Sequence, residues 1–523
     1  MMDVHERLMW VMLVQDFIQN GARIHPNKTA LVCGPARFTY AQLDAMANRL
    51  ANAFHKFGVA RGDRIAIYLN NCVEGVVGIF AAAKADAVFI HLNRTTKSDT
   101  LVSILNNCQA RIILLDKRAV TQRLPERILK EVGSLREVIV CRDAASSEKS
   151  RPEEHMDFEL IQRTSSAERP DSHNIDLDLA CLIYTSGTTG ESKGVMCDHN
   201  NITFVTHSIT TYLNNTDNDV VMNVLPLSFS YGLYQLLAMF YIGGTLVLEE
   251  SFAFPDFVLE KMAQEKVTGF AGVPTIYSML LNMDIHNWDL SSLKYLTNAA
   301  AGLPVEHVKR LRQTLPKAKL YLMYGLTEAA RAMYLPPVQS DIRPASSGIA
   351  IPGTELWIED ENGFRLGPGE VGELIVRGRN VMRGYWEAPE LTAARFRAAS
   401  LPGERVCLSG DLFKMDEQGY YYFVSRKDDM IKTRGEKVAP REVEQVLYAI
   451  PGVQDAAVVA IPDPLIGNAI KAFIVARDVV LTAAEVISLC KARLEDFKVP
   501  RDVEFRDELP KTSSGKVRRM DLR

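Results

Sequence analysis

Short apolar runs alternate with helix-like amphipathic stretches through most of the first 330 residues of this chain. Residues 64–69 (RIAIYL) are apolar and residues 73–83 follow with helical spacing; the alternation then repeats at 88–92, 100–107 and 111–115. A short apolar run that leads into a helix is typical of a strand in a parallel sheet, because the returning helix covers the face of that sheet. The pattern therefore predicts an α/β fold.

The character of the chain changes after residue 340. Shorter strand-like runs with glycine-rich turns follow, at 355–358, 372–376 and 420–424. They predict a β-rich subdomain over about 340–426, and from Pro440 onward the pattern predicts a compact α+β unit. Because 523 residues exceed one ordinary core, we predict a large N-terminal domain of packed α/β subdomains over 1–426 and a small C-terminal domain over 427–523. A polar segment at 143–176 is predicted to be a solvated connector.

Composition limits the classes of partner. The net charge is −4, with 60 basic and 64 acidic residues, so no overall field favours nucleic acid or an anionic membrane. Eight scattered cysteines without a CxxC pair are typical of reduced thiols rather than of disulfides or a zinc site. The longest apolar runs, such as 233–242, are about half of a membrane span, and no signal-peptide pattern is recognisable. We therefore expect a soluble cytoplasmic protein.

The stretch YTSGTTGESKG at 184–194 combines three glycines, four hydroxyl side chains from Thr185 to Thr189, and a lysine. Glycines let backbone N–H groups point at an anion, hydroxyl groups add donors, and Lys193 adds a cation, so the natural ligand is a polyphosphate. The order Lys-Gly differs from the common GxxxxGK[ST] loop. By composition alone, such a cluster is more often a flexible surface hairpin.

Four further motifs place charged or hydroxyl groups after apolar runs. They are YGLTE at 324–328, SGD at 409–411, RKDDMIKTRG at 426–435 and PKTSSGK at 510–516. Each of them alone is compatible with a solvated turn. Together, in this order and over essentially the whole chain, the five motifs resemble those of the adenylate-forming superfamily, which contains acyl-CoA synthetases, free-standing adenylation enzymes and luciferases.

The resemblance implies a two-step ligation. A carboxylic acid attacks the α-phosphate of ATP, which gives an acyl-adenylate and pyrophosphate, and a thiol then displaces AMP to form a thioester. The thiol belongs to CoA or to the phosphopantetheine arm of a separate acyl carrier protein. Attack of one anion on another requires a site that neutralises the charge growing on the phosphate oxygens, with Mg²⁺ as a further cation.

The resemblance also assigns the nucleotide site. The loop that holds the β- and γ-phosphates consists of Thr185, Ser186, Gly187, Thr188, Thr189 and Lys193. Thr327 contacts the α-phosphate, and Glu328 helps to bind Mg²⁺, a hard cation that takes oxygen ligands. Asp411 accepts the ribose hydroxyl groups, with Arg426 near the same sugar. The remaining residues on the nucleotide side are Tyr324, which stacks on adenine, and Gly325, Ala299, Ala300, Lys432 and Lys437.

The two half-reactions require different active sites. Lys516 is expected to bridge the substrate carboxylate and the α-phosphate in the first step, a task that suits a compact ammonium on a flexible stem. It must leave before a thiol can enter, and the resemblance implies that the C-terminal domain rotates about the hinge residue Asp428. After rotation, Gly435 would line the thiol tunnel. Without the resemblance, Asp428 would be read as part of a simple turn.

The acyl pocket is predicted at Phe229, Ser230, Tyr231, Val273 and Asn298. Many relatives carry histidine at the place of Phe229, so this chain has an apolar wall instead of a polar gate. Enzymes for α-amino acids usually hold the substrate amine with an acidic side chain at the place of Ser230, and a buried ammonium without a partner is costly. The sequence therefore favours a neutral acyl or aryl acid.

Several alternatives stay open at this stage. The stretch 331–337 (RAMYLPP) resembles a subgroup that contains prolyl-carrier-loading ligases, which favours a carrier protein as acceptor and a prolyl adenylation enzyme as an alternative, although Ser230 argues against the latter. A nucleotide- or acyl-binding protein without turnover is a third reading, and the presence of Glu328, Asp411 and Lys516 counts against it. Luciferase-like oxidation of the adenylate shares every motif.

Overall fold

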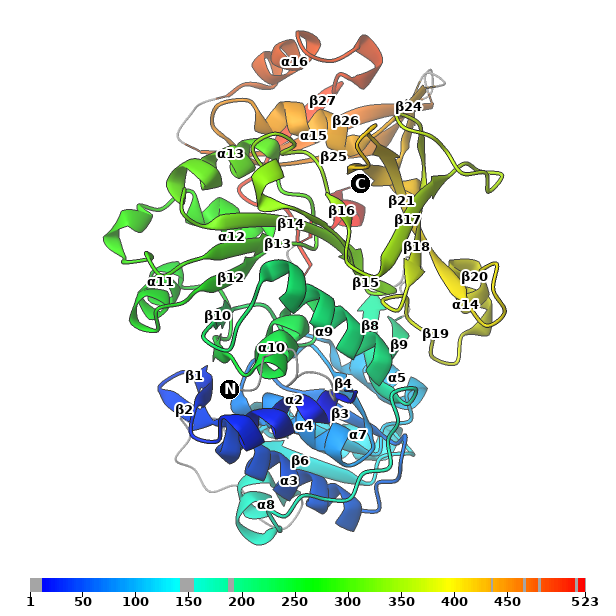
Figure 1. The fold of residues 1–523 in the computed structure, drawn as a ribbon. Coiled ribbons are helices and arrows are strands. Elements are labelled where there is room, and N and C mark those ends of the chain that lie inside the picture. The colour runs from blue at the N-terminus through cyan, green and yellow to red at the C-terminus, as the bar shows by residue number, and fades with distance from the viewer. Residues whose placement is uncertain are drawn as a thin grey trace.

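The computed structural model describes residues 12–141, 155–186, 192–433, 436–463, 467–477, 481–512 and 516–522. Figure 1 shows the blue and cyan part of the chain at the bottom, the green part above it, the yellow β-rich part to one side and the orange C-terminal part at the top. The predicted α/β class, with a large N-terminal and a smaller C-terminal domain, is confirmed by this arrangement and by the structural relatives below.

One mixed sheet has the strand order β19-β9-β8-β4-β3-β5-β6-β7. Its strands are β3 Arg64–Tyr68, β4 Val88–His91, β5 Ile112–Asp116, β6 Glu137–Cys141, β7 Met156–Asp157, β8 Leu179–Ser186, β9 Ser192–Asp198 and β19 Gly384–Tyr385. The strands from β8 to β7 run parallel, and β9 and β19 add an antiparallel edge. The apolar runs of the sequence form its buried centre, as expected for strands covered on both faces.

A second mixed sheet has the order β16-β15-β14-β13-β12-β10-β11-β1-β2. Its strands are β1 Thr29–Cys33, β2 Ala36–Thr39, β10 Val220–Asn223, β11 Thr245–Leu248, β12 Gly269–Gly272, β13 Tyr295–Asn298, β14 Lys319–Leu326, β15 Ala329–Leu335 and β16 Ile349–Ala350. The strands from β14 to β1 in this order are parallel, whereas β15 and β16 at one edge and β2 at the other pair antiparallel. The YGLTE motif lies at the former edge.

Helices cover both sheets and join them. They are α2 Val14–Ile24, α3 Tyr40–Lys56, α4 Val73–Lys84, α5 Ser98–Asn107, α6 Lys117–Thr121, α7 Leu124–Glu131, α8 Phe158–Thr164, α9 His199–Leu213, α10 Ser230–Ile242, α11 Pro255–Gln264, α12 Pro274–Leu280, α13 Val305–Thr314 and α14 Pro389–Arg395. The helices α2, α4, α9 and α10 contact one another, and their buried residues belong to one apolar core that includes strands of both sheets (Figure 1).

The β-rich layer has the order β17-β18-β21-β20, with β22 also paired to β21. Its strands are β17 Thr354–Glu359, β18 Val371–Gly378, β20 Phe396–Ala398, β21 Arg405–Met415 and β22 Tyr421–Arg426. A single 3₁₀ turn, Lys427–Asp429, follows β22. This layer positions the SGD motif in β21.

The C-terminal part contains β23 Ile431–Thr433, β24 Glu436–Val438, α15 Pro440–Tyr448, β25 Val453–Asp463, β26 Gly467–Ala476, α16 Ala483–Lys491 and β27 Asp502–Phe505. One apolar cluster lies between its helices and one face of the β25-β26-β27 sheet. Leu509 and Leu522 pack with Phe473 in a second cluster. Because these leucines flank Lys516 in sequence, their burial fixes both ends of the segment that carries it.

The segment 143–176, predicted to be a solvated connector, contains a helix. Residues 142–154 lie outside the described part of the chain, but 158–164 form helix α8. Asp157 caps this helix by accepting hydrogen bonds from the N–H groups of Glu159 and Leu160, and Phe158 and Ile161 are buried. A capping carboxylate and two buried apolar groups are enough to order a short helix in a polar segment.

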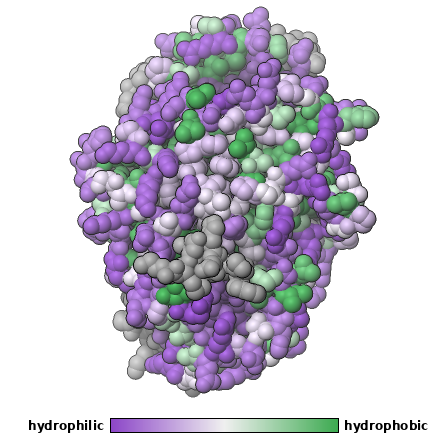
Figure 2. Space-filling model, viewed as in Figure 1, coloured by the Kyte–Doolittle hydropathy of each residue, from purple (hydrophilic) through white to green (hydrophobic). Residues whose placement is uncertain are grey.

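The surface of the molecule and the state of its cysteines both bear on the expected cellular environment. Within the described residues, no helix is long and apolar enough to cross a membrane. The face visible in Figure 2 is mostly hydrophilic, with apolar residues scattered over it. All eight cysteines are free thiols, six of them buried: Cys108, Cys141, Cys181, Cys197, Cys407 and Cys490.

Candidate active site

The SGD motif lies in the middle of β21, opposite the end of β22. Asp411 pairs in register with Arg426, and the Arg426 Nε atom is 3.6 Å from the Asp411 Oδ1 atom. Gly410 has φ +68°, and its N–H group donates to Glu373 Oε1 at 2.9 Å. A Cβ atom on Gly410 would lie 2.5 Å from the Arg395 Nη1 atom, so only glycine allows this arginine to approach.

Asp411 is a buried acceptor that is only partly satisfied. Its Oδ2 atom accepts a hydrogen bond of 2.6 Å from the Tyr324 hydroxyl group, while Oδ1 is buried and has no hydrogen-bond partner. Burial raises the pKa of Asp411, and the bond from Tyr324 and the charges of Arg426, Arg395 and Lys516 act in the opposite direction. An unsatisfied buried carboxylate oxygen needs a donor, and a ribose hydroxyl group is a suitable one.

The YGLTE and phosphate-loop motifs meet at Tyr385. Thr327 and Glu328 form the turn between β14 and β15, and the Tyr385 hydroxyl group donates to Glu328 Oε1 at 2.5 Å. The Lys193 Nζ atom lies 5.8 Å from the centre of the Tyr385 ring. Thr185 and Ser186 end β8, while Gly187, Thr188 and Thr189 lie outside the described residues. Glu328 offers the oxygen ligand that a Mg²⁺ ion held mainly by substrate phosphates requires.

Lys516 enters the same cleft from the C-terminal domain. Its carbonyl oxygen accepts from the Thr512 N–H group at 2.8 Å, and its own N–H group donates to the Thr512 hydroxyl oxygen at 3.1 Å. Lys516 is exposed, but surrounding protein desolvates its ammonium group. This desolvation lowers the pKa of Lys516, Arg426 lowers it further, and Asp411 and Glu328 raise it. The structure therefore brings four predicted residues together: Glu328, Asp411, Arg426 and Lys516.

The hairpin β23–β24 lies apart from this group. Lys432 and Lys437 are paired across it and are exposed, and the Lys437 Nζ atom lies 3.4 Å from a carboxylate oxygen of Glu361 in the β-rich layer. Gly435, predicted in the thiol tunnel, lies outside the described residues. Asp428 is exposed in the 3₁₀ turn between β22 and β23. The described ion pair of Lys437 is thus with Glu361 rather than with the Asp411 carboxylate.

The predicted acyl wall lies between α10 and β13. Phe229 and Ser230 begin α10, and the buried Tyr231 donates its hydroxyl hydrogen to the Thr297 carbonyl oxygen at 2.7 Å. Val273 precedes α12, and Asn298 ends β13 with its Oδ1 atom buried and without a partner. Ala299 is buried, and Ala300 has φ +72°, a conformation that an alanine rarely adopts. Of these residues, Tyr231 on α10 is thus bonded to β13, which pairs with β14 of the YGLTE hairpin.

Comparison with known families identifies this constellation. Residues 18–386 match the AMP-binding enzyme family, and residues 442–516 match the AMP-binding enzyme C-terminal domain. The chain belongs to the AMP-binding enzymes. The predicted resemblance to adenylate-forming enzymes is thereby confirmed.

Relatives of this AMP-binding enzyme are ligases. It is 31% identical to a long-chain-fatty-acid–CoA ligase of Bacillus subtilis (strain 168), over 97% of this chain and 94% of the relative. It is 33% identical to a feruloyl-CoA synthase of Amycolatopsis sp, over 96% of both chains. Among solved structures, an anthranilate CoA ligase with bound anthranoyl-AMP superimposes with a TM-score of 0.89 at 27% identity, over 100% of this chain and 98% of that one. The predicted enzyme class, an AMP-forming acid–thiol ligase, is confirmed.

Sequence reasoning missed two residues of this AMP-binding enzyme's site. Tyr385 links Lys193 to Glu328, as described above. Arg395 ends α14, and its Nε atom is buried without a partner. Burial acts to lower the pKa of Arg395, but Glu328 and Asp411 among its neighbours hold it above the ordinary value. Neither residue belongs to a recognisable motif, so only their proximity to Glu328 and Asp411 reveals them.

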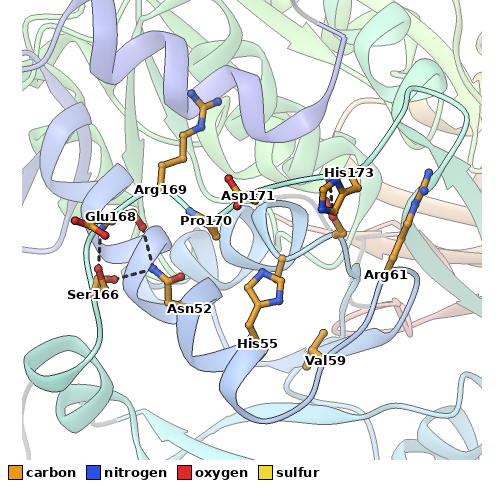
Figure 3. A pocket seen from close by; sticks show the side chains of 12 residues that line it. Asn52, His55, Val59, Arg61, Ser166, Glu168, Arg169, Pro170, Asp171 and His173 are labelled. Carbon is orange, nitrogen blue, oxygen red and sulfur yellow. Dashed lines mark hydrogen bonds between the residues drawn. The ribbon is translucent and has the colours of Figure 1, made fainter.

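A separate surface pocket of about 790 Å³ lies at the end of α3 (Figure 3). Asn52 donates to the carbonyl oxygens of Ser166 and Glu168, both at 2.9 Å, and the His173 N–H group donates to Asp86 at 2.7 Å. These bonds attach the segment after α8 to the N-terminal α/β unit. The described residues that line this pocket include none of the predicted site residues.

Proposed function

We propose that this enzyme converts a carboxylic acid and ATP into an acyl-adenylate and pyrophosphate, and then transfers the acyl group to the thiol of CoA with release of AMP. The observation that supports this most is the convergence of Glu328, Asp411, Arg426 and Lys516, from four separate motifs, on one cleft. CoA is the acceptor named in the relatives; a carrier protein is an alternative acceptor.

Each residue has a role that follows from its chemistry. The unpartnered Asp411 oxygen would accept from ribose, and Lys193 with the neighbouring phosphate loop would hold the β- and γ-phosphates. Lys516 would neutralise charge on the α-phosphate during attack by the acid. Glu328 would hold Mg²⁺, which supplies further positive charge to the phosphates.

We also propose that the domains meet at the turn after β22, with Asp428 as the hinge. The described contacts across this boundary include the Lys427–Glu373 pair at 3.0 Å, the Lys437–Glu361 pair at 3.4 Å, the His307 and Tyr448 rings with centroids 5.7 Å apart, and Arg441 5.3 Å from the centre of the Phe423 ring. The exposed Lys437–Glu361 pair contributes about 0–1 kcal/mol, so rotation of the small domain would mainly have to separate the ring contacts of α15. Free thiols at all eight cysteines support a cytoplasmic location.

The test is ATP–pyrophosphate exchange with a panel of carboxylic acids, followed by CoA-dependent release of AMP. We expect exchange only with added acid, and thioester formation only with added CoA. If the enzyme supports exchange but transfers the acyl group only to a phosphopantetheinylated carrier protein and not to CoA, the carrier protein is the acceptor instead of CoA. Absence of exchange with every acid would refute the proposed function and leave the binding-only alternative.

A prolyl adenylation enzyme is the weaker candidate. Ser230 offers no negative charge to a substrate ammonium, and the buried guanidinium of Arg331 lies 4.5 Å from the neighbouring Tyr231 ring. A cation at this place repels an ammonium group. Stimulation of exchange by proline alone would contradict this reasoning.

A further inference from the structure

Arg331 carries a buried positive charge beside the predicted acyl wall. The residue is 6% exposed, and its Nε and Nη2 groups are buried without a hydrogen-bond partner. Within the described part of the chain, Arg331 forms no ion pair with a carboxylate. Arginine stays protonated in proteins, and a buried charge without a counter-charge is costly. A native site that keeps such a charge calls for an anionic ligand.

The backbone directs this side chain towards α10. The pairing of β14 with β15 shifts register between Tyr324 and Leu326, and Arg331 lies in the resulting bulge with φ +51°. A Cβ atom on Gly325 would lie 2.5 Å from the Arg331 backbone nitrogen, so the glycine of YGLTE allows the bulge to form. Bulges beside active sites commonly re-aim a side chain, and the left-handed conformation costs about 1 kcal/mol for a non-glycine residue.

The neighbours of the guanidinium are tyrosines without negative charge: Tyr231 and Tyr234 on α10, and Tyr212 on α9, whose hydroxyl oxygen accepts a hydrogen bond from Arg331. The Arg331 Cζ atom lies 4.5 Å from the centre of the Tyr231 ring and 5.9 Å from that of Tyr234. Phe229 packs edge-on against Tyr231 at 6.5 Å. Aromatic faces stabilise a cation only partly, so the charge remains available to a ligand.

Arg331 is also close in the chain to the predicted ligands of the phosphate and Mg²⁺. Arg331 follows Glu328 by three residues, and three residues of extended chain span about 10 Å. The backbone of Arg331 therefore lies no more than about 10 Å from that of Glu328, which is predicted to help bind Mg²⁺.

We propose that Arg331 binds a second carboxylate of the acid substrate, so that the enzyme activates a dicarboxylic acid in preference to a neutral acid. This inference rests on the proposed function and narrows its substrate class. Phe229 and Ser230 at the start of α10 favour a neutral chain, but the guanidinium of Arg331 adds a positive charge beside Tyr231 of the same helix. A guanidinium and a carboxylate can form two parallel hydrogen bonds, which also fixes the orientation of the acid.

The test compares dicarboxylic acids from malonic to sebacic acid, together with terephthalic acid, with their monomethyl esters in ATP–pyrophosphate exchange. Each ester has the same skeleton but lacks the second charge. For the wild type, we expect kcat/KM for the best diacid to exceed that for its ester by about 100-fold or more, through KM. Arg331→Gln should abolish this preference, and Arg331→Lys should restore part of it.

The control is Arg343→Gln. Arg343 also packs on a ring, 4.3 Å from the centre of Tyr420, but it forms an ion pair with Asp416 at 3.2 Å. We expect this variant to leave the acid preference unchanged. Arg331→Met should melt at the same or a higher temperature than the wild type, because it removes an uncompensated buried charge.

Two results would overturn the inference. One is a wild type that activates esters or simple monocarboxylic acids as well as diacids. The other is an Arg331→Met variant that melts lower while Arg331→Gln keeps the diacid preference, which would assign Arg331 a structural role. Absence of exchange with all acids would refute the proposed function itself, and this inference with it; exchange with neutral acids alone would refute only the inference.

Discussion

Replacement of Lys516 by alanine should separate the two half-reactions. In the described orientation, Lys516 shares the cleft with Arg426, Asp411 and Glu328, and all three change its pKa. Removal of the ammonium leaves the carboxylates of Asp411 and Glu328 with less compensation when an anionic acid meets an anionic phosphate. The loss of one preorganised charge at a developing oxyanion costs about 3 kcal/mol, or roughly 100-fold in the rate of adenylation.

The assay measures each half-reaction separately. Adenylation is followed by ATP–pyrophosphate exchange, and thioester formation is followed in a single turnover with CoA and the synthetic adenylate of the best acid. We expect Lys516→Ala to lose the first activity and to keep the second within a few-fold, because Lys516 must leave the cleft before the thiol enters.

Lys511→Ala is the matched control in the same segment. Lys511 forms an ion pair with Asp455 at 2.6 Å within the C-terminal domain, so its loss should leave both half-reactions close to wild type. An equal loss of both half-reactions in Lys516→Ala would refute the assignment of Lys516 to the first step. Unchanged exchange would refute its role in charge neutralisation.

Three further predictions concern the nucleotide, the hinge and pH. Asp411→Asn keeps the shape of the acceptor but loses its charge, so calorimetry should show ATP binding weakened by about 30-fold, with no loss of melting temperature. Asp428→Pro fixes φ at the proposed hinge, so exchange should survive and thioester formation should fail, whereas Asp428→Ala keeps both; loss of exchange in the proline variant would contradict the hinge. Burial lowers the pKa of His199 from 6.5 to about 4, so this residue is neutral in the folded state and stability is lost as pH falls below about 6.5; near pH 5 its share is about 2 kcal/mol. Thermal melts should therefore decline less steeply with acid in His199→Asn than in the wild type, and an identical decline would contradict this assignment.

The sequence determined the fold class and most of the chemistry. Apolar runs such as 112–115 are long enough for a strand and are followed or preceded by helical spacing, so their parallel pairing could be predicted from local pattern and chain order. Glu328, Asp411 and Lys516 were predicted because their motifs, in this order along the chain, resemble those of adenylate-forming enzymes, although each motif alone was compatible with a solvated turn. Helix α8 was missed, because a polar segment is ordered there by the burial of Phe158 and Ile161 against distant elements.

The tertiary structure alone decided which groups lie together and which charges are left without a partner. Tyr385 reaches Glu328 from a strand 57 positions further along the chain, and Arg395 faces Glu328 and Asp411 from the end of α14. In the sequence, Arg331 is only the first residue of the 331–337 stretch. Its bulge, its aromatic neighbours and its unpartnered nitrogens are features of the folded chain. The physical reason is that the cost of a charge depends on its desolvation and on its neighbours, and both are properties of the folded chain rather than of local sequence.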